Sequence, residues 1–347
     1  MNKITAILVA LIIALAVTVV PISAQSATTQ VQVSSGGGTP PVIKVKWEQD
    51  TTATLEDGDD LHKLLGAQFN PTCIYKGDKM VEYYAIVTDV EDGGDVKQVW
   101  ADVYHPLDSW ATANNFFKYE VPFTKMTDNV AGKAKFLAAV KAGLVKFNTG
   151  YTEADVVYEL DKGTARVWTG RAPLDYEQPG GDYTVKDIAL DFNDNPSAIL
   201  ENTFTYIKAG CFETDNDKVD YGSVSVSKMK VIPGDTVFQK IADNKMTVRN
   251  LGNTNVNLKI KQDDMGFGKD QTGKWNVQFD ARIGNLVTSA IYDPSLPLPP
   301  VWTVIPGKLP HSTDDELDLS IHVIKGLPGN IYKGILDLAV DSFDTNP

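Results

Sequence analysis

The sequence predicts an all-β protein of two β-sandwich domains, with a small helical insertion in the first. Short stretches of alternating apolar and polar residues recur from residue 42 onward, and turns rich in Gly, Pro, Asn and Asp separate them. The 347 residues suffice for two domains, and 43% hydrophobic residues can fill a core in each. One stretch, residues 127–163, changes to a helical period.

Residues 1–24 have the layout of a secretory signal peptide. A lysine precedes an apolar run over residues 4–20, and two small residues close the segment. We expect cleavage after Ala24 and a secreted, extracellular location at the cell surface. The run is also about long enough to span a bilayer, so retention as an N-terminal anchor is the alternative. After cleavage, no membrane contact is expected.

A short strand and a hinge follow the leader over residues 25–41. Gln30, Val31, Gln32 and Val33 alternate as a half-buried strand does, and the hinge "SSGGGTPP" cannot hold a fixed geometry by itself. Such a strand can pair with its own domain or with the exposed sheet edge of a neighbouring copy. A disordered leader without a role is the alternative.

The first sandwich is predicted over residues 42–208. Residues 81–89 and 96–106 flank the acidic turn "VEDGGD" and are expected to form a hairpin. The pattern predicts further strands at 115–123, 164–170 and, around the turn "NDNPS", a pair within 179–207.

Two helices are predicted inside this sandwich, over residues 127–163. The first aligns three apolar residues on one face, namely Phe136, Val140 and Leu144. The second begins at the capping-box-like pair Thr152 and Asp155 and ends at Gly163. The pair contains no His or Cys, so we expect a cap over an open end of the sandwich or an assembly contact rather than a ligand lid.

The second sandwich is predicted over residues 209–347. Residues 246–250 and 255–262 are expected to form a hairpin with alternate apolar residues inward: Met246, Val248, Val256, Leu258 and Ile260. Three more alternating stretches predict strands at residues 274–283, 316–326 and 332–340.

Two stretches resemble known extracellular families. The phrase "PGGDYTVKDIALDFNDN" (179–195) resembles the late strands of immunoglobulin-like and PKD-like domains. The segments 233–236, 247–260 and 317–323 resemble secreted β-sandwich proteins of the TasA and camelysin type, which include fibre-forming matrix and pilus subunits. The first resemblance implies an immunoglobulin-like first domain, whereas the strand pattern of residues 209–347 predicts a jelly-roll-like second one. The whole chain resembles an archaeal cell-envelope protein.

The two cysteines, Cys73 and Cys211, predict one disulfide in an exported chain. Two separate buried thiols are the alternative.

Composition and motifs argue against several function classes. A formal charge of −13 disfavours nucleic acid as a partner. The four histidines are isolated, and no zinc, nucleophile-elbow or phosphate-loop motif is present, so we expect neither an enzyme nor a bound cofactor. The histidines are His62, His105, His311 and His322.

Two acidic turns are candidates for calcium, which prefers oxygen ligands at short spacing. The first offers Asp89, Glu91, Asp92 and Asp95, and the second offers Asp191, Asn193 and Asp194. Asp and Asn also form turns by bonding to their own backbone, which explains both stretches without a metal.

The sequence therefore favours an extracellular structural subunit that assembles with itself into a sheath, surface layer or filament. Other envelope proteins or glycans are further candidate partners. The alternative is a surface binding module or adhesin that recognises carbohydrate or protein.

Overall fold

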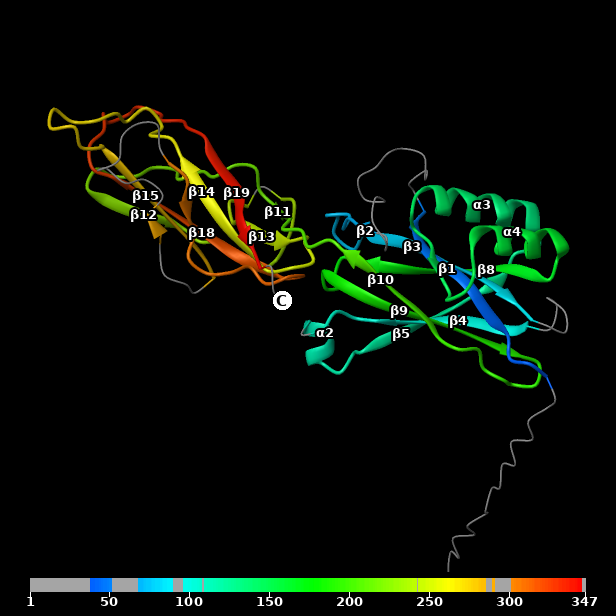
Figure 1. The fold of residues 1–347 in the computed structure, drawn as a ribbon. Helices are drawn as coiled ribbons and strands as arrows, with labels where there is room; N and C mark the ends of the chain where they lie inside the picture. The colour runs from blue at the N-terminus through cyan, green and yellow to red at the C-terminus, as the bar shows by residue number, and fades with distance from the viewer. Residues whose placement is uncertain are drawn as a thin grey trace, which may run out of the picture. The chain divides into compact units, whose positions relative to one another are not determined.

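Most of the regular structure in this protein is β-strand, and the all-β prediction is confirmed (Figure 1). The computed structural model describes residues 38–51, 68–89, 96–107, 109–241, 243–284, 289–290 and 301–344. The predicted leader 1–24 and the predicted strand from Gln30 to Val33 lie outside these residues. Among the described residues, no helix has the length and apolar character needed to cross a bilayer.

The first sandwich has two five-stranded sheets. One sheet contains, in spatial order, β6 (Thr124–Lys125), β8 (Ala165–Asp175), β3 (Asp78–Thr88), β1 (Val42–Asp50) and β7 (Lys146–Phe147). The other contains β2 (Gln68–Phe69), β10 (Leu200–Tyr206), β9 (Gly181–Asp191), β4 (Val96–Tyr104) and β5 (Lys118–Pro122). Buried aromatic and β-branched side chains, such as Tyr83, Val185 and Phe204, form one continuous core.

Only one of the two hairpins predicted here forms. β9 and β10 pair antiparallel around the "NDNPS" turn, as predicted. The predicted hairpin of residues 81–89 and 96–106 is wrong, because β3 and β4 belong to different sheets. Both edges of β3 are taken by β1 and β8, so the chain crosses to the facing sheet, where β4 pairs with β5 and β9.

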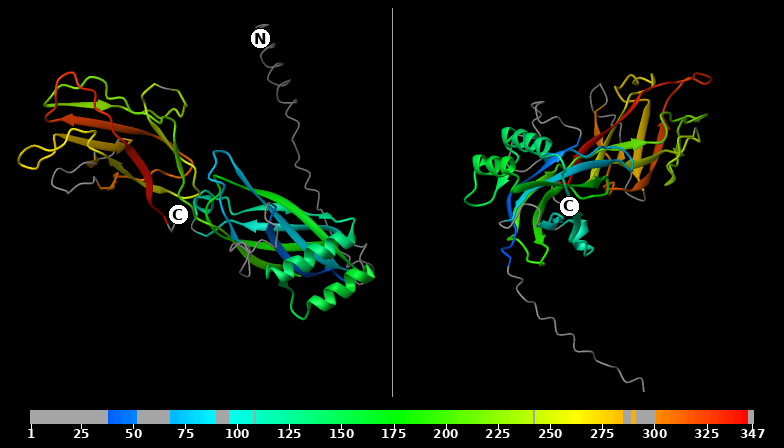
Figure 2. Two further views of the ribbon diagram at one scale, coloured as in Figure 1. Left: turned by 90° about the horizontal axis from the view of Figure 1, so that it is seen from above. Right: turned by 90° about the vertical axis from the view of Figure 1, so that its right-hand side faces the viewer.

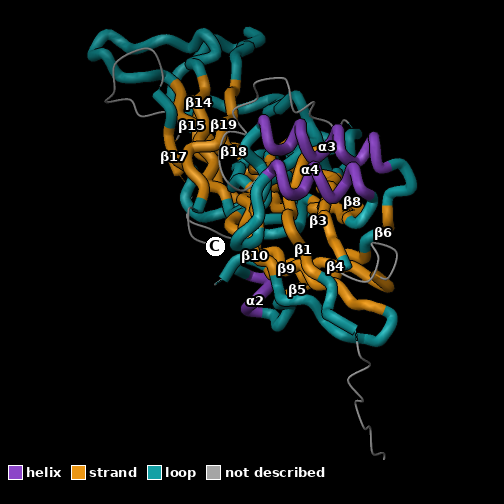
Figure 3. Tube along the Cα trace, turned by 45° about the vertical axis from the view of Figure 1, so that its right-hand side comes forward, coloured by secondary structure: helices purple, strands orange, loops and turns teal. Residues whose placement is uncertain are grey.

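Two helices cover the outer face of the sheet that contains β1, β3 and β8 (Figures 1 and 3). They are α3 (Asn129–Lys141) and α4 (Glu153–Lys162), and they run beside each other (Figure 2). A third helix, α2 (Trp110–Ala113), is a single turn. Phe136 of α3 lies 6.1 Å from Trp47 between ring centroids, so the pair covers a sheet face, not the expected open end.

The details of the helical insertion are partly as predicted. Thr152 and Asp155 form a complete capping box, and Gly163 ends α4 with a φ of 76°. The first helix is shorter than predicted, because Gly143 adopts a φ of 73° just after α3 and redirects the chain. Residues 146–147 then form β7 and pair with β1, so the insertion also contributes a strand.

The second sandwich has a six-stranded and a three-stranded sheet. The larger contains, in order, β11 (Phe212–Thr214), β13 (Thr247–Asn250), β18 (Asp314–Val323), β15 (Val277–Ile283) and β16 (Ser289–Ala290), with β12 (Lys228–Ile232) also on β18. The smaller contains β17 (Thr303–Val304), β14 (Val256–Gln262) and β19 (Leu336–Phe343). Their facing apolar side chains form a second core, separate from the first.

The predicted hairpin of residues 246–250 and 255–262 is also wrong. β13 lies in the larger sheet and β14 in the smaller one, and the turn between them crosses the sandwich. Asn250 holds this crossing, because its buried side-chain amide donates to the carbonyl oxygens of Thr254 and Leu309. The five apolar residues predicted to face inward are nevertheless all buried.

Removing the capping hydroxyl of α4 tests whether this N-cap stabilises the helix. Thr152→Ala should lower the free energy of unfolding by about 1 kcal/mol, because the backbone N–H of Asp155 loses its acceptor. Urea titration followed by circular dichroism measures this. Thr149→Ala, at an exposed turn nearby, is the matched control. Equal stability of the two variants would contradict the capping role.

Candidate functional site

The last strand of the second sandwich has one open edge. β19 pairs along its whole length with β14, and among the described residues no strand pairs with its other side. An unpaired edge leaves a row of backbone N–H and C=O groups available to another chain. With eight residues, β19 is longer than the usual protected edge strand.

The inward side chains of β19 are incompletely covered. Leu336, Leu338 and Val340 lie opposite Gln262, Ile260 and Leu258 of β14 and pack on the second core. The β14 residues are fully buried, whereas the three β19 residues are only half-buried. The smaller sheet therefore stops one strand short of covering its own apolar face.

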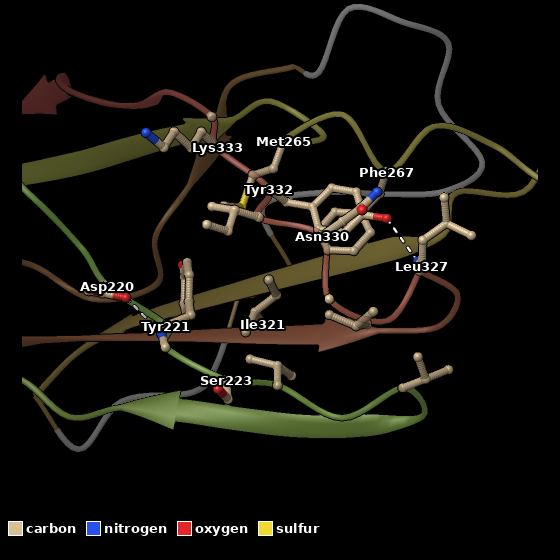
Figure 4. A pocket seen from close by; sticks show the side chains of 18 of the residues that line it. Asp220, Tyr221, Ser223, Met265, Phe267, Ile321, Leu327, Asn330, Tyr332 and Lys333 are labelled. Atoms are coloured by element: carbon tan, nitrogen blue, oxygen red, sulfur yellow. Dashed lines mark hydrogen bonds between the residues drawn. The ribbon is translucent and has the colours of Figure 1, made fainter.

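A groove of about 890 Å³ opens between the two sheets near the start of β19. Figure 4 shows its walls: Ile321 of β18 and Tyr221 come from one side, and Met265, Phe267 and Tyr332 come from the other. These side chains form the apolar part of the groove, and the charged residues Lys218, Asp220 and Lys333 also line it. Extended backbone suits such a space, because side chains on one face of a strand can enter it while the other face stays in water.

Two aromatic residues make the outer wall rigid. Phe267 and Tyr332 stack with ring centroids 3.8 Å apart and planes 11° from parallel. The Tyr332 hydroxyl accepts a hydrogen bond of 2.9 Å from the backbone N–H of Leu327. Leu327 and Ile331 are 68% and 86% exposed at the rim, which is unusual for large apolar side chains.

The hydroxyl of Tyr221 has no hydrogen-bond partner among the described residues. Tyr221 is only 7% exposed, and this burial raises the pKa of its hydroxyl, which therefore stays protonated. A buried polar atom without a partner costs free energy and is rare in native structures.

Cys73 and Cys211 form the predicted disulfide, with Cα atoms 5.7 Å apart. Cys73 lies in the turn before β3, with a φ of 52°, and Cys211 immediately precedes β11. The bond therefore ties the start of the second sandwich to a turn of the first. Nearby, the Arg249 guanidinium lies 3.6 Å from the ring centroid of Tyr75.

The second acidic turn is organised by its own backbone. Asp191 accepts hydrogen bonds of 2.8 Å from the backbone N–H groups of Asn193 and Asn195. Burial alone would raise the pKa of Asp191, but these hydrogen bonds and Lys97 outweigh it, and the pKa is lowered. Asp194 forms an ion pair with Lys97 at the surface. These contacts match the turn interpretation made from the sequence.

Calcium binding at the first acidic turn stays a prediction. Asp89 is buried at the end of β3, while Glu91, Asp92 and Asp95 lie outside the described residues. Within the part of the chain that the structure describes, no three carboxylate, His or Cys side chains gather as a metal site.

The histidines that are described occupy packed positions. His105 lies between the rings of Tyr119 and Tyr183, and burial lowers its pKa. Burial also lowers the pKa of His311. His322 lies within β18, paired with Gln278 of β15. His62 lies outside the described residues.

Comparisons with known proteins identify no family. No family model matches the chain, and no curated protein matches it. Among solved structures, the C-terminal domain of the Streptococcus pyogenes antigen I/II-family protein AspA is 12% identical, with a TM-score of 0.21 over 86% of this chain and 96% of that one. A protein from Eubacterium rectale described as secreted is 8% identical, with a TM-score of 0.22 over 74% and 67%. Likenesses this low carry no argument about fold or function.

The disulfide is expected to contribute strongly to stability. It spans 138 residues of sequence, for which the chain-entropy model gives ~5 kcal/mol. Reduction should therefore lower the urea midpoint clearly, and alkylation of the unfolded, unreduced protein should modify neither cysteine. The double variant Cys73→Ser, Cys211→Ser is the control and should not respond to reductant. Two alkylated thiols without reduction would refute the bond in the isolated protein.

Proposed function

We propose that this chain is an exported structural subunit that assembles with itself at the cell surface, as a sheath, surface layer or filament. In this proposal, the segment from Gln30 to Val33 of one copy adds as a strand to the open edge of β19 in the next copy. The observation that carries the proposal is that unpaired edge, which begins two residues after Gly334, the last residue that lines the groove.

The pattern of the donor segment fits the acceptor. Val31 and Val33 fall on one face of a strand and can enter the groove, while Gln30 and Gln32 face water. Added backbone hydrogen bonds would satisfy the free edge of β19, and the two valines would cover its half-buried leucines. The Gly- and Pro-rich composition of the hinge would allow the donor to leave its own copy.

Donor and acceptor lie at different ends of the sequence. The donor precedes the first sandwich, whereas the acceptor belongs to the second. Such a contact joins two unlike surfaces, so every added copy offers a new free acceptor and the assembly grows without closing unless geometry forms a ring. This is the behaviour that a sheath, layer or filament requires.

Export and family resemblance are in line with the proposal. The predicted leader at residues 1–24 would direct the mature chain out of the cytoplasm. The resemblance of the second sandwich to the TasA and camelysin type rests on the segments named above, and the resemblance of the whole chain to archaeal envelope proteins rests on its general sequence character. The hairpin expected within that resemblance does not form, so the proposal rests on the β19 edge and the groove.

A binding module or adhesin is the second candidate function. The stacked pair of Phe267 and Tyr332, both half-buried, is the observation that favours it, because sugar rings pack on aromatic faces. A glycan array probed with the N-terminally truncated protein distinguishes the candidates. Glycan binding that Tyr332→Ala abolishes would favour the adhesin.

Loss of the donor should abolish assembly without unfolding either sandwich. We expect the full mature chain to form ordered polymers in negative-stain electron microscopy. Deletion of residues 25–37, or the double variant Val31→Asp, Val33→Asp, should leave monomers with an unchanged melting temperature, since a charge would have to enter the apolar groove. A truncated protein that still forms the same polymer would contradict strand donation.

A variant at the acceptor should have the same effect. Ile331→Glu introduces a charge at the groove rim and should block assembly while the protein stays folded, because Ile331 is 86% exposed. Ile199→Glu, at a residue of the first sandwich that is 57% exposed, is the matched control and should assemble normally. Equal assembly of both variants would place the contact elsewhere.

A further inference from the structure

Three charged side chains lie wholly inside the first sandwich. Lys46 and Glu48 belong to β1 and Asp187 belongs to β9, so they come from facing sheets. Lys46 is 0% exposed, and the other two are each 1% exposed. Charged groups are almost never buried to this degree without a specific reason, because removal from water costs several kcal/mol per ion.

The three groups are within bonding distance of one another. Lys46 Nζ lies 2.9 Å from Asp187 Oδ1 and 3.1 Å from Glu48 Oε1. It also donates a hydrogen bond of 3.0 Å to the carbonyl oxygen of Val185. The amide of Asn202, on β10, donates to the other oxygen of Glu48. The Lys46 amine and the carboxyl groups of Asp187 and Glu48 are therefore held together by strands of the two sheets.

Most strand neighbours of this cluster are apolar or aromatic, but Lys146 of β7 is also a register partner of Lys46, and Tyr83 of β3 is the register partner of Glu48. In the strand register, Ala85 of β3 lies beside Lys46, and Ala101 of β4 and Leu200 of β10 lie on either side of Asp187. Among the described residues, Asp187 Oδ2 accepts no hydrogen bond. No salt bridge in the described part of the chain brings another cation to Glu48 or Asp187.

One lysine cannot neutralise two buried carboxylates. Burial raises the pKa of Asp187 to about 7, although Lys46 opposes this. At neutral pH a protonated Asp187 therefore lies beside the Lys46 nitrogen in part of the molecules. That is the protonation state that an acyl substitution at Asp187 requires, because a hydroxyl leaves a carboxylic acid more readily than an oxide leaves a carboxylate.

We propose that Lys46 and Asp187 form an intramolecular amide bond that links the two sheets of the first sandwich. Glu48 takes a proton from the Lys46 ammonium, and the amine attacks Asp187 Cγ. The new C–N bond forms as the C–O bond breaks, and the hydroxyl leaves with the second amine proton as one water molecule. Glu48 ends protonated, so the cluster becomes neutral, and no oxidant or co-reactant is needed.

Two physical effects favour this step inside the fold. The strands hold the reacting atoms together, and such orientation is equivalent to effective concentrations on the order of 10⁵ M or more. The core also excludes water, which is the second product of the condensation, and its removal favours the amide over the separate amine and acid. Replacement of the buried ammonium and carboxylate by an amide and a neutral acid further removes the cost of burying these charges.

Mass spectrometry of the full chain tests the bond directly. After unfolding, reduction and proteolysis, we expect one linked peptide pair that contains Lys46 and Asp187 and weighs one water less than the two peptides together. Recovery of the Lys46 peptide only in unlinked form would overturn the proposal. A pair linked through Asn202, with loss of ammonia, would overturn the assignment of Asp187.

Two variants separate the reaction from the structural role of the cluster. Glu48→Gln keeps the size of the side chain and its contact with Asn202 but removes the proton acceptor. The yield of the linked peptide pair should therefore fall at least tenfold. Lys44→Gln, on the same strand at the Lys44–Glu159 ion pair, should keep the linked pair. An undiminished linked pair in Glu48→Gln would remove Glu48 from the reaction. If Glu48→Gln does not fold, the native peptide pair still decides whether the bond exists.

Discussion

The unpaired edge of β19 is the constraint on which this account of the second sandwich depends. A six-stranded sheet offers more apolar surface than three strands can cover, and the shortfall appears as a groove and as half-buried leucines. The exposed apolar side chains and the free backbone groups then both favour an added strand. Such a strand would bury the apolar side chains and form hydrogen bonds with the free backbone groups. A protein with such an edge either protects it or uses it for assembly.

The first sandwich differs from the second in how its two sheets are held together. Its core carries charges from both sheets, and its outer face is closed by α3 and α4. The disulfide ties it to the start of the second sandwich. In an assembly of linked copies, pulling forces would pass through the first sandwich from its N-terminal strand to that junction. A covalent bond between β1 and β9 would resist separation of the sheets under such a load.

The sequence allowed the local features to be predicted better than the pairing of strands. The α4 capping box and the β9–β10 hairpin follow from short-range patterns, and both are found. The other two predicted hairpins failed because a short turn can either fold back or cross to the facing sheet, and the alternation of side chains is the same in both cases. The charge cluster was missed for a related reason. Lys46 and Glu48 alternate with Trp47, which is the pattern of a strand with one face in water, and only the helices over Trp47 reveal that both faces are buried.

Hydrogen exchange at β19 tests the central claim most directly. In an antiparallel strand, every second backbone N–H points away from the partner, so half of the β19 amides face the open edge. Addition of a synthetic peptide of residues 28–33 to protein lacking residues 25–37 should slow exchange at those amides and leave the amides bonded to β14 unchanged. The same peptide with aspartate in place of both valines should have no effect. If exchange at β19 is the same with and without the native peptide, the edge is not the acceptor and assembly by strand donation is refuted.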